Sequence, residues 1–261
     1  MKDIRIFPWL LITLTVLMTL AAGCRATASD TQPENGQSET VSATLALTPT
    51  LDTTTQDREN MVLRQIEARG VEDPDVLAAM LAVPRHLFVP DKYLSQAYAD
   101  HPLPIGYGQT ISQPYIVALM TEALELERED QVLEIGTGSG YQAAVLAELG
   151  TQVFTIEIIP ELAADAGTRL ANLGYTDIEV RNADGYFGWE EKAPFDAVIV
   201  TAAPDHLPQP LIEQMAEGAR LVIPIGPIGA VQTLWLFEKK NGEVIALNLG
   251  AVQFVPLTGE H

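Results

Sequence analysis

Cysteine, histidine and basic side chains are scarce in this chain. One cysteine and four histidines occur among 261 residues, so no disulfide can form within the chain and no metal-ligand spacing is present. We therefore expect no metal. Lysine and arginine number 15 against 35 aspartates and glutamates, a formal net charge of −20. A surface this acidic repels phosphate backbones, so we expect no nucleic-acid partner.

The N-terminus carries a targeting pattern. A short basic start is followed by an apolar run over 6–22 and by Ala-Ala-Gly directly before Cys24. This order predicts a secretory signal peptide over 1–24, ending in a stretch that resembles a bacterial lipoprotein box with Cys24 as the lipidated residue. Two other interpretations are an uncleaved N-terminal anchor and translation that starts near Met61.

Two further regions follow the signal. Residues 25–57 are rich in Thr, Ser, Ala, Gln and Pro, which predicts a disordered tether because little apolar surface is available for burial. Residues 58–261 form the expected globular domain. The lipoprotein interpretation places a monomeric domain in the cell envelope, outside the cytoplasm, and in contact with the membrane only through its anchor. A start near Met61 places it in the cytoplasm.

Strand and helix patterns alternate along the globular part, after three N-terminal helix patterns and before two strand patterns joined by Asn241-Gly242, a strong hairpin signal. The expected helices cover 58–69, 75–83, 115–126, 141–150, 160–173 and 210–217, and the expected strands 131–137, 152–158, 178–183, 195–202, 220–225, 231–240 and 243–256. Alternation of this kind predicts an α/β fold, with a doubly wound, mostly parallel seven-stranded sheet, a C-terminal antiparallel hairpin and N-terminal helices.

The sharpest motif lies between the first of these strands and its helix. It reads Glu134, Ile135, Gly136, Thr137, Gly138, Ser139, Gly140. Alternate glycines let the backbone turn tightly beside a ligand. The spacing differs from the Gly-x-Gly-x-x-Gly of dinucleotide folds and fits S-adenosylmethionine better, since a carboxylate at Glu134 is favourable near its cationic groups.

Two more acids stand at strand ends. Glu157 is placed to accept hydrogen bonds from ribose hydroxyls, and the carboxylate of Asp184, in Asp184-Gly185, to reach the adenine amino group. The alternative is that each acid only caps the helix that follows it. Because the acids accompany the glycine motif, we favour a nucleoside site that includes both, with Gly185.

The globular part resembles the protein-L-isoaspartate(D-aspartate) O-methyltransferases, a family of class I S-adenosylmethionine-dependent enzymes. The similarity runs over about 62–257, and Thr-Ile-Ser-Gln-Pro at 110–114 is its most specific stretch. The other matching stretches are 83–90, 97–100, 102–106, the glycine motif with 141–144, 184–185, 188–189 and 254–257. The resemblance implies methyl transfer from S-adenosylmethionine to the free carboxylate of isoaspartyl residues in damaged proteins, which are the expected partners.

The same resemblance assigns the acceptor side. It makes Ser112 the active-site serine, with Thr110, Ile111 and Gln113 contacting the substrate. The alternative for Ser112 is a cap on the helix near Pro114. Two other functions stay open: a methyltransferase with a different, small-molecule acceptor, and a non-catalytic envelope binding protein. The non-catalytic function is considered because S-adenosylmethionine is made in the cytoplasm, whereas the signal would place this domain outside it.

Overall fold

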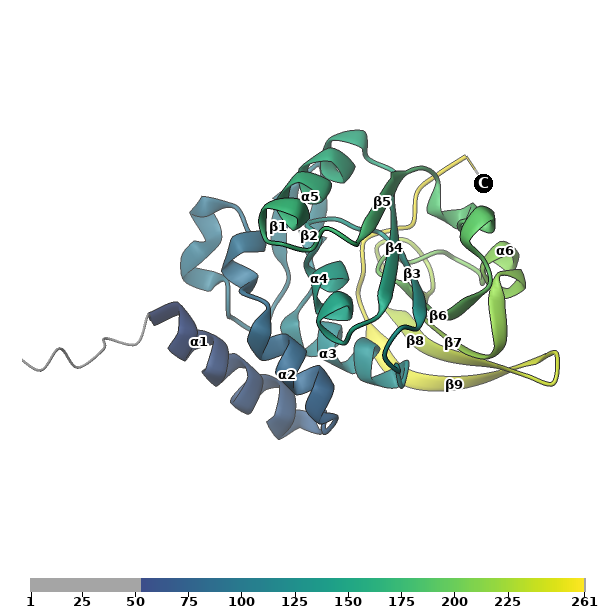
Figure 1. Cartoon of the computed structure of the whole chain (residues 1–261), viewed down its shortest axis with the longest axis horizontal. Coiled ribbons are helices and arrows are strands. Elements are labelled where there is room, and N and C mark those ends of the chain that lie inside the picture. Colours follow the sequence, from purple (N-terminus) through teal and green to yellow (C-terminus); the bar gives the residue numbers. More distant parts are fainter. Residues whose placement is uncertain (1–52, 261) are drawn as a thin grey trace, which may run out of the picture. The chain divides into compact units, whose positions relative to one another are not determined.

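The computed structural model describes residues 53–260 (Figure 1). The expected signal peptide, Cys24 and residues 25–52 of the expected tether lie outside the described residues. Helix α1 spans Thr53–Met61 and continues through a π turn, Val62–Ile66, and a 3-10 turn, Glu67–Arg69. The sequence pattern predicted a later start, at 58, because the first residues of the helix carry no apolar periodicity. Met61 and Ile66 are fully buried and anchor the segment.

A seven-stranded sheet forms the centre of the domain, in the order β5-β4-β3-β6-β7-β8-β9. Pairing is parallel from β5 to β7 and antiparallel for β8 and β9, as the sequence predicted. The strands are β3 (Gln131–Ile135), β4 (Gln152–Glu157), β5 (Glu179–Asn182), β6 (Phe195–Val200), β7 (Met215–Ile225), β8 (Gln232–Lys240) and β9 (Glu243–Val252).

Helices cover both faces of the sheet. They are α2 (Pro74–Ala82), α3 (Pro114–Ala123), α4 (Tyr141–Glu148), α5 (Pro160–Asn172) and α6 (Gln209–Glu213), and short 3-10 helices span Arg85–Phe88, Asp91–Gln96, Gly185–Phe187 and Glu190–Lys192. Successive strand residues point to opposite faces. Val132 accordingly packs in the core under α2, α3 and α4, while Leu133 packs in the core under α6.

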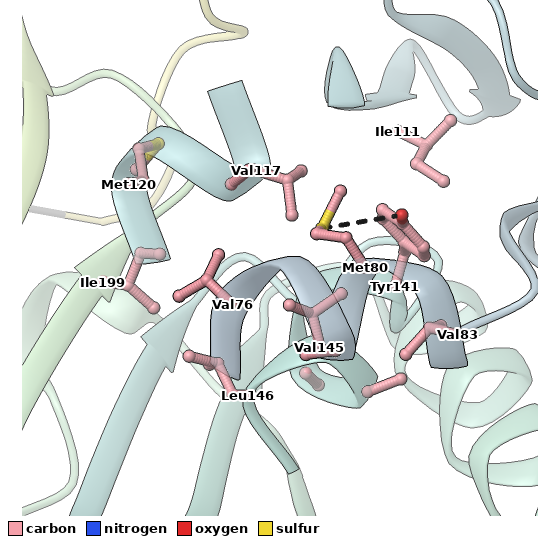
Figure 2. Close-up of a cluster of buried hydrophobic side chains, with 14 of the residues drawn as sticks. Val76, Met80, Val83, Ile111, Val117, Met120, Tyr141, Val145, Leu146 and Ile199 are labelled. Carbon is pink, nitrogen blue, oxygen red and sulfur yellow. Dashed lines mark hydrogen bonds between the residues drawn. The ribbon is translucent and has the colours of Figure 1, made fainter. Parts of the chain in front are cut away.

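The larger core joins the N-terminal helices to the helix that follows the glycine motif. Figure 2 shows Met80 of α2, Val117 of α3 and Val145 of α4 converging beside Tyr141, whose hydroxyl lies 3.9 Å from the Met80 sulfur. All of these side chains are buried. The N-terminal layer therefore fixes the start of α4, and with it one wall of the site.

Two hairpins differ in how well the sequence predicted them. Asn241 and Gly242 have positive φ angles of 54° and 77°, which confirms the predicted turn between β8 and β9. A second hairpin, β1 (Leu103–Gly106) with β2 (Gln109–Ile111), was not predicted. Its strands are too short to show a period-two pattern, and Pro104 interrupts the first. This small hairpin carries Thr110 and Ile111 to the site.

Candidate active site

The glycine loop lies where the strand order reverses, because β4 and β6 flank β3 on opposite sides. Ligands of doubly wound sheets bind at such a switch point. Thr201, just beyond β6, hydrogen-bonds through its hydroxyl to the carbonyl oxygens of Ile135 and Gly136, at 3.0 and 2.7 Å. A Cβ on Gly136 would stand 2.5 Å from the Thr201 hydroxyl oxygen. Glycine is thus required there by packing as well as by its φ of 98°.

Glu134 is a fully buried acid beneath this loop. Thr155 donates a hydrogen bond to Oε2 at 2.5 Å, whereas Oε1 has no partner among the described residues. Burial raises the pKa of Glu134 to about 8, against the opposing effect of the Thr155 hydrogen bond. The side chain lines a small cavity together with Gly136 and Ser139. A buried acceptor without a donor fits a ligand that brings positive charge, such as the ammonium and sulfonium groups of S-adenosylmethionine.

Glu157 links the glycine loop to the next helix. Its Oε2 accepts from the backbone N–H of Gly138 at 2.8 Å, and Oε1 accepts from that of Ile159, at the start of α5, at 3.0 Å. It also lines the cavity formed with Ile156 and Gly185. The structure therefore places Glu157 beside the glycine loop, in the wall of this cavity, and gives it a contact with the start of α5 as well. Its contact with ribose stays a prediction.

Asp184 and Gly185 follow β5 on the same edge. Asp184 Oδ1 accepts from the Tyr186 N–H at 3.0 Å, and Oδ2 from the Glu260 N–H at 3.0 Å. The capping alternative thus describes Asp184 in this conformation, and its contact with adenine stays a prediction. A Cβ on Gly185 would lie 2.4 Å from the Ile135 side chain, so glycine permits this close approach to β3.

The remaining residues of the glycine motif hold the loop in its conformation. Thr137 Oγ1 lies 2.6 Å from Thr155 Oγ1, which continues the network of Glu134. The Ser139 carbonyl accepts from Arg169 at 2.9 Å. Gly140 is the N-cap of α4 with φ 87°, packed against Leu170.

A larger groove, of about 610 Å³, opens beside the loop. Its lining residues are Pro102, Thr110, Ser112, Gln113, Ile116, Thr201, Val231, Ala251, Val252, Gln253, Phe254 and Val255. We refer to it as the acceptor groove. Ser112 lines both this groove and the cavity of Glu134, whereas Thr110 and Thr201 line the groove and both small cavities. These three residues therefore stand at the junction where the acceptor groove meets the small cavities.

The structure separates the two interpretations of Ser112. Helix α3 has Gln113 as its N-cap, with no side-chain capping hydrogen bond. The capping alternative for Ser112 is therefore wrong, and its hydroxyl is available at the junction. Gln113 lines the groove, whereas Ile111 is buried and lines the Glu134 cavity.

Some residues of the site carried no recognised signal in the sequence. Thr201 lies just after the end of β6, as Asp184 lies just after β5, and the same strand-end rule would have selected it. The far wall of the groove, at 251–255, comes from the C-terminal end of the chain. Positions 254 and 255 belong to a stretch that matches the family, but only the fold shows that they line the groove. Within residues 53–260, no group of three His, Cys, Asp or Glu side chains is placed to hold a metal ion.

A doubly wound sheet with a glycine loop at its switch point, and an uncharged acceptor groove against that loop, defines a Rossmann-like methyltransferase. The family model of protein-L-isoaspartate(D-aspartate) O-methyltransferase (PCMT) matches residues 56–261. The chain belongs to this family, as its motifs predicted.

Relatives and solved structures agree with this assignment. The chain is 58% identical to a protein-L-isoaspartate O-methyltransferase from Picosynechococcus sp., over 80% of this chain and 93% of the relative. It is 56% identical to protein-L-isoaspartate O-methyltransferase 2 from Shewanella sediminis, over 77% and 83%. A solved protein-L-isoaspartate O-methyltransferase superposes with a TM-score of 0.72 at 31% identity, covering 77% of this chain and 66% of that one. A Plasmodium falciparum beta-aspartate methyltransferase (PCMT) in complex with S-adenosyl-L-homocysteine gives 0.67 at 28% identity, over 78% and 98%.

Proposed function

We propose that this chain transfers a methyl group from S-adenosylmethionine to the free carboxylate of L-isoaspartyl and D-aspartyl residues in damaged proteins. The observation that carries this proposal is the junction at Ser112, where the acceptor groove meets the cavity of the glycine loop. The family shared with the relatives supports both the reaction and the cofactor. The two functions left open by the sequence, a small-molecule acceptor and a non-catalytic role, find no comparable support.

The nucleoside side of the site is built from backbone and acids. Glu134 faces the positive charge of the methionine part, and the loop from Gly136 to Gly140 gives the close approach. Glu157 and Asp184 mark the ribose and adenine ends. When bound there, S-adenosylmethionine supplies a methyl group on a sulfonium, whose C–S bonding pair returns to sulfur as a new C–O bond forms.

The acceptor side requires positioning and no strong base. An isoaspartyl carboxylate is already ionised at neutral pH, so no proton has to be removed before an oxygen attacks the methyl carbon. The Ser112 hydroxyl donates to one carboxylate oxygen and holds the other in line with the methyl group. Thr110 and Gln113 supply further polar contacts on the same wall. Such alignment is a large part of catalysis in transfers of this type.

The product leaves the enzyme as a methyl ester. The backbone nitrogen of the following residue attacks the ester carbonyl, methanol leaves, and a succinimide forms. Water then opens the ring, in part to normal aspartate. Because these later steps are intramolecular or need only water, methyl transfer is the only step that the enzyme has to catalyse.

A pair of peptides tests the proposal. One carries L-isoaspartate and its twin carries normal aspartate in the same sequence, and transfer of labelled methyl is followed for both. The proposal expects methylation of the isoaspartyl peptide only. Equal methylation of both peptides, or of neither, would contradict it.

We also propose that the enzyme is anchored in the cell envelope through a lipid on Cys24 and acts there as a monomer. The basic start, the apolar run and Ala-Ala-Gly-Cys support this location. Met61 is fully buried at the end of α1, so a start there would remove the helix that leads into it, which weighs against the cytoplasmic alternative. Mass measurement of the native N-terminus tests the proposal: a chain that begins at a lipidated Cys24 is expected, and a chain beginning at Met1 or Met61 would contradict it.

A further inference from the structure

The acceptor groove is uncharged although the chain is strongly acidic. None of its lining side chains, all within residues 53–260, is an Asp, Glu, Lys or Arg, whereas the chain as a whole carries a net charge of −20. Beyond the hydroxyls and the Gln113 amide at the junction, and the Gln253 amide on the far wall, the walls are mainly apolar. A polypeptide that enters this groove meets most of the hydrogen-bonding groups at the junction and mainly apolar surface beyond it.

One rim of the groove exposes apolar side chains with no internal role. The loop Gly226–Val231, between β7 and β8, reads Gly-Pro-Ile-Gly-Ala-Val, and we refer to it as the apolar rim. Ile228 is 73% exposed and Val231 is 66% exposed. Val231 lines the groove itself. Turns between strands ordinarily carry polar residues, so this exposed apolar turn is unusual at a position beside a substrate site.

The apolar rim is held in place rather than loosely attached. The Gly226 N–H donates to the Pro204 carbonyl at 3.0 Å, and the Ala230 N–H to that of Pro227 at 3.3 Å, which closes a turn with Ile228 at its tip. The buried side chain of Gln232 accepts from the Phe254 N–H at 2.8 Å. Gln232 thereby ties the base of the rim to the opposite wall of the groove.

We infer that the apolar rim binds an apolar side chain of the substrate polypeptide beside the isoaspartyl residue, so that this enzyme selects damage sites with apolar neighbours. The inference rests on the proposed function. The occupant is an extended stretch of the substrate protein, because chain leaves the reacting residue in two directions and the groove continues from Ser112 to Val231. An acidic neighbour is disfavoured twice, by the apolar surface and by the net charge of the enzyme.

Kinetics with matched peptides test the inference. Peptides contain isoaspartate flanked on one side by Leu, Ser or Asp, and each side is varied separately. On one side, the KM of the wild-type enzyme is expected to be about fivefold lower for Leu than for Ser, with kcat unchanged, as partial burial of one aliphatic side chain on an open rim implies. The KM for Asp is expected to be the highest.

Variants locate the effect. Ile228→Ser is expected to raise the KM for the Leu peptide towards that for Ser and to leave the KM for Ser unchanged. Val231→Thr, which changes the groove wall itself, is expected to raise the KM for Leu more than the KM for Ser. Ile245→Ser is the matched control, since Ile245 is also exposed, at 54%. It pairs with Glu238 near the start of β9, whereas the residues of β9 that line the groove lie at its end. Ile245→Ser is expected to leave all KM values unchanged.

Three outcomes would overturn the inference: equal KM values for Leu and Ser on both sides in the wild type, a preference that survives both rim variants, or an equal loss in Ile245→Ser. Loss of the proposed function would be seen separately, as a failure to distinguish isoaspartyl from aspartyl peptides, and would overturn both.

Discussion

The Thr201 hydroxyl lies 2.7 Å from the carbonyl oxygen of Gly136 and fills the space that a side chain on Gly136 would need. This contact joins the end of β6 to the loop after β3, and so fixes the floor of the site where the strand order reverses. It also places Thr201 at the junction of the acceptor groove and the nucleoside cavities.

Replacement of Gly136 by alanine is therefore expected to damage cofactor binding. The new methyl group would meet Thr201, and the residue would keep a positive φ that costs alanine about 1–2 kcal/mol. We expect the affinity for S-adenosylhomocysteine to fall by at least about tenfold in calorimetric titration. Gly174→Ala is the control: Gly174 has a similar φ of 93° but nothing within 4 Å of its added Cβ. Equal losses in both variants would contradict the role of the Thr201 contact.

Buried Glu134 is expected to make stability depend on pH. The folded chain keeps this carboxyl protonated up to about pH 8, whereas the unfolded chain ionises it near 4.5. Its contribution to the free energy of unfolding is thus present below pH 4.5 and is lost as pH rises to 8, by roughly 5 kcal/mol at most. Denaturant titrations at several pH values should show Glu134→Gln gaining stability over the wild type across this window. A constant difference between the two proteins would contradict the buried acid.

The same acid is expected to couple cofactor binding to proton release. A cationic ligand beside Glu134 favours the ionised carboxylate, so the wild type should release a proton on binding at pH 7. Calorimetry in buffers of different ionisation enthalpy measures the number released. Glu134→Gln should release fewer protons, and equal release by both proteins would contradict the contact.

The C-terminal segment is expected to limit nucleoside entry. The Glu260 N–H donates a hydrogen bond to Asp184 Oδ2, the atom that we expect to reach adenine. Pro256, Leu257 and Thr258 line the cavity that Glu157 and Gly185 also line. Removal of residues 259–261 should speed association of S-adenosylhomocysteine several-fold in stopped-flow measurements and leave the melting temperature nearly unchanged. Slower association, or an unchanged rate, would show that the tail does not obstruct the site.

Local patterns in the sequence predicted the parts of the fold that depend on local chemistry. The glycine motif and Asn241-Gly242 specify their own backbone conformations, and buried strands carry apolar runs, such as 197–200 in β6. The nucleoside loop and its acids followed from these patterns together with the rule for strand ends.

The acceptor groove was less accessible from the sequence because its walls are far apart in the chain. Thr110 and Phe254 meet only after the sheet has formed, and the β1–β2 hairpin that presents Thr110 is too short to leave a pattern. Ser112 was identified through the family motif, whereas its freedom from a capping role became visible only in the geometry of α3.

Kinetic comparison of Ser112→Ala with the wild type tests the central claim most directly. The claim predicts a fall in kcat/KM of about ten- to a hundredfold on an isoaspartyl peptide, with the affinity for S-adenosylhomocysteine unchanged, and no change for Ser95→Ala, whose side chain is exposed elsewhere. Full activity in Ser112→Ala, or an equal loss of nucleoside affinity, would contradict the placement of methyl transfer at this junction.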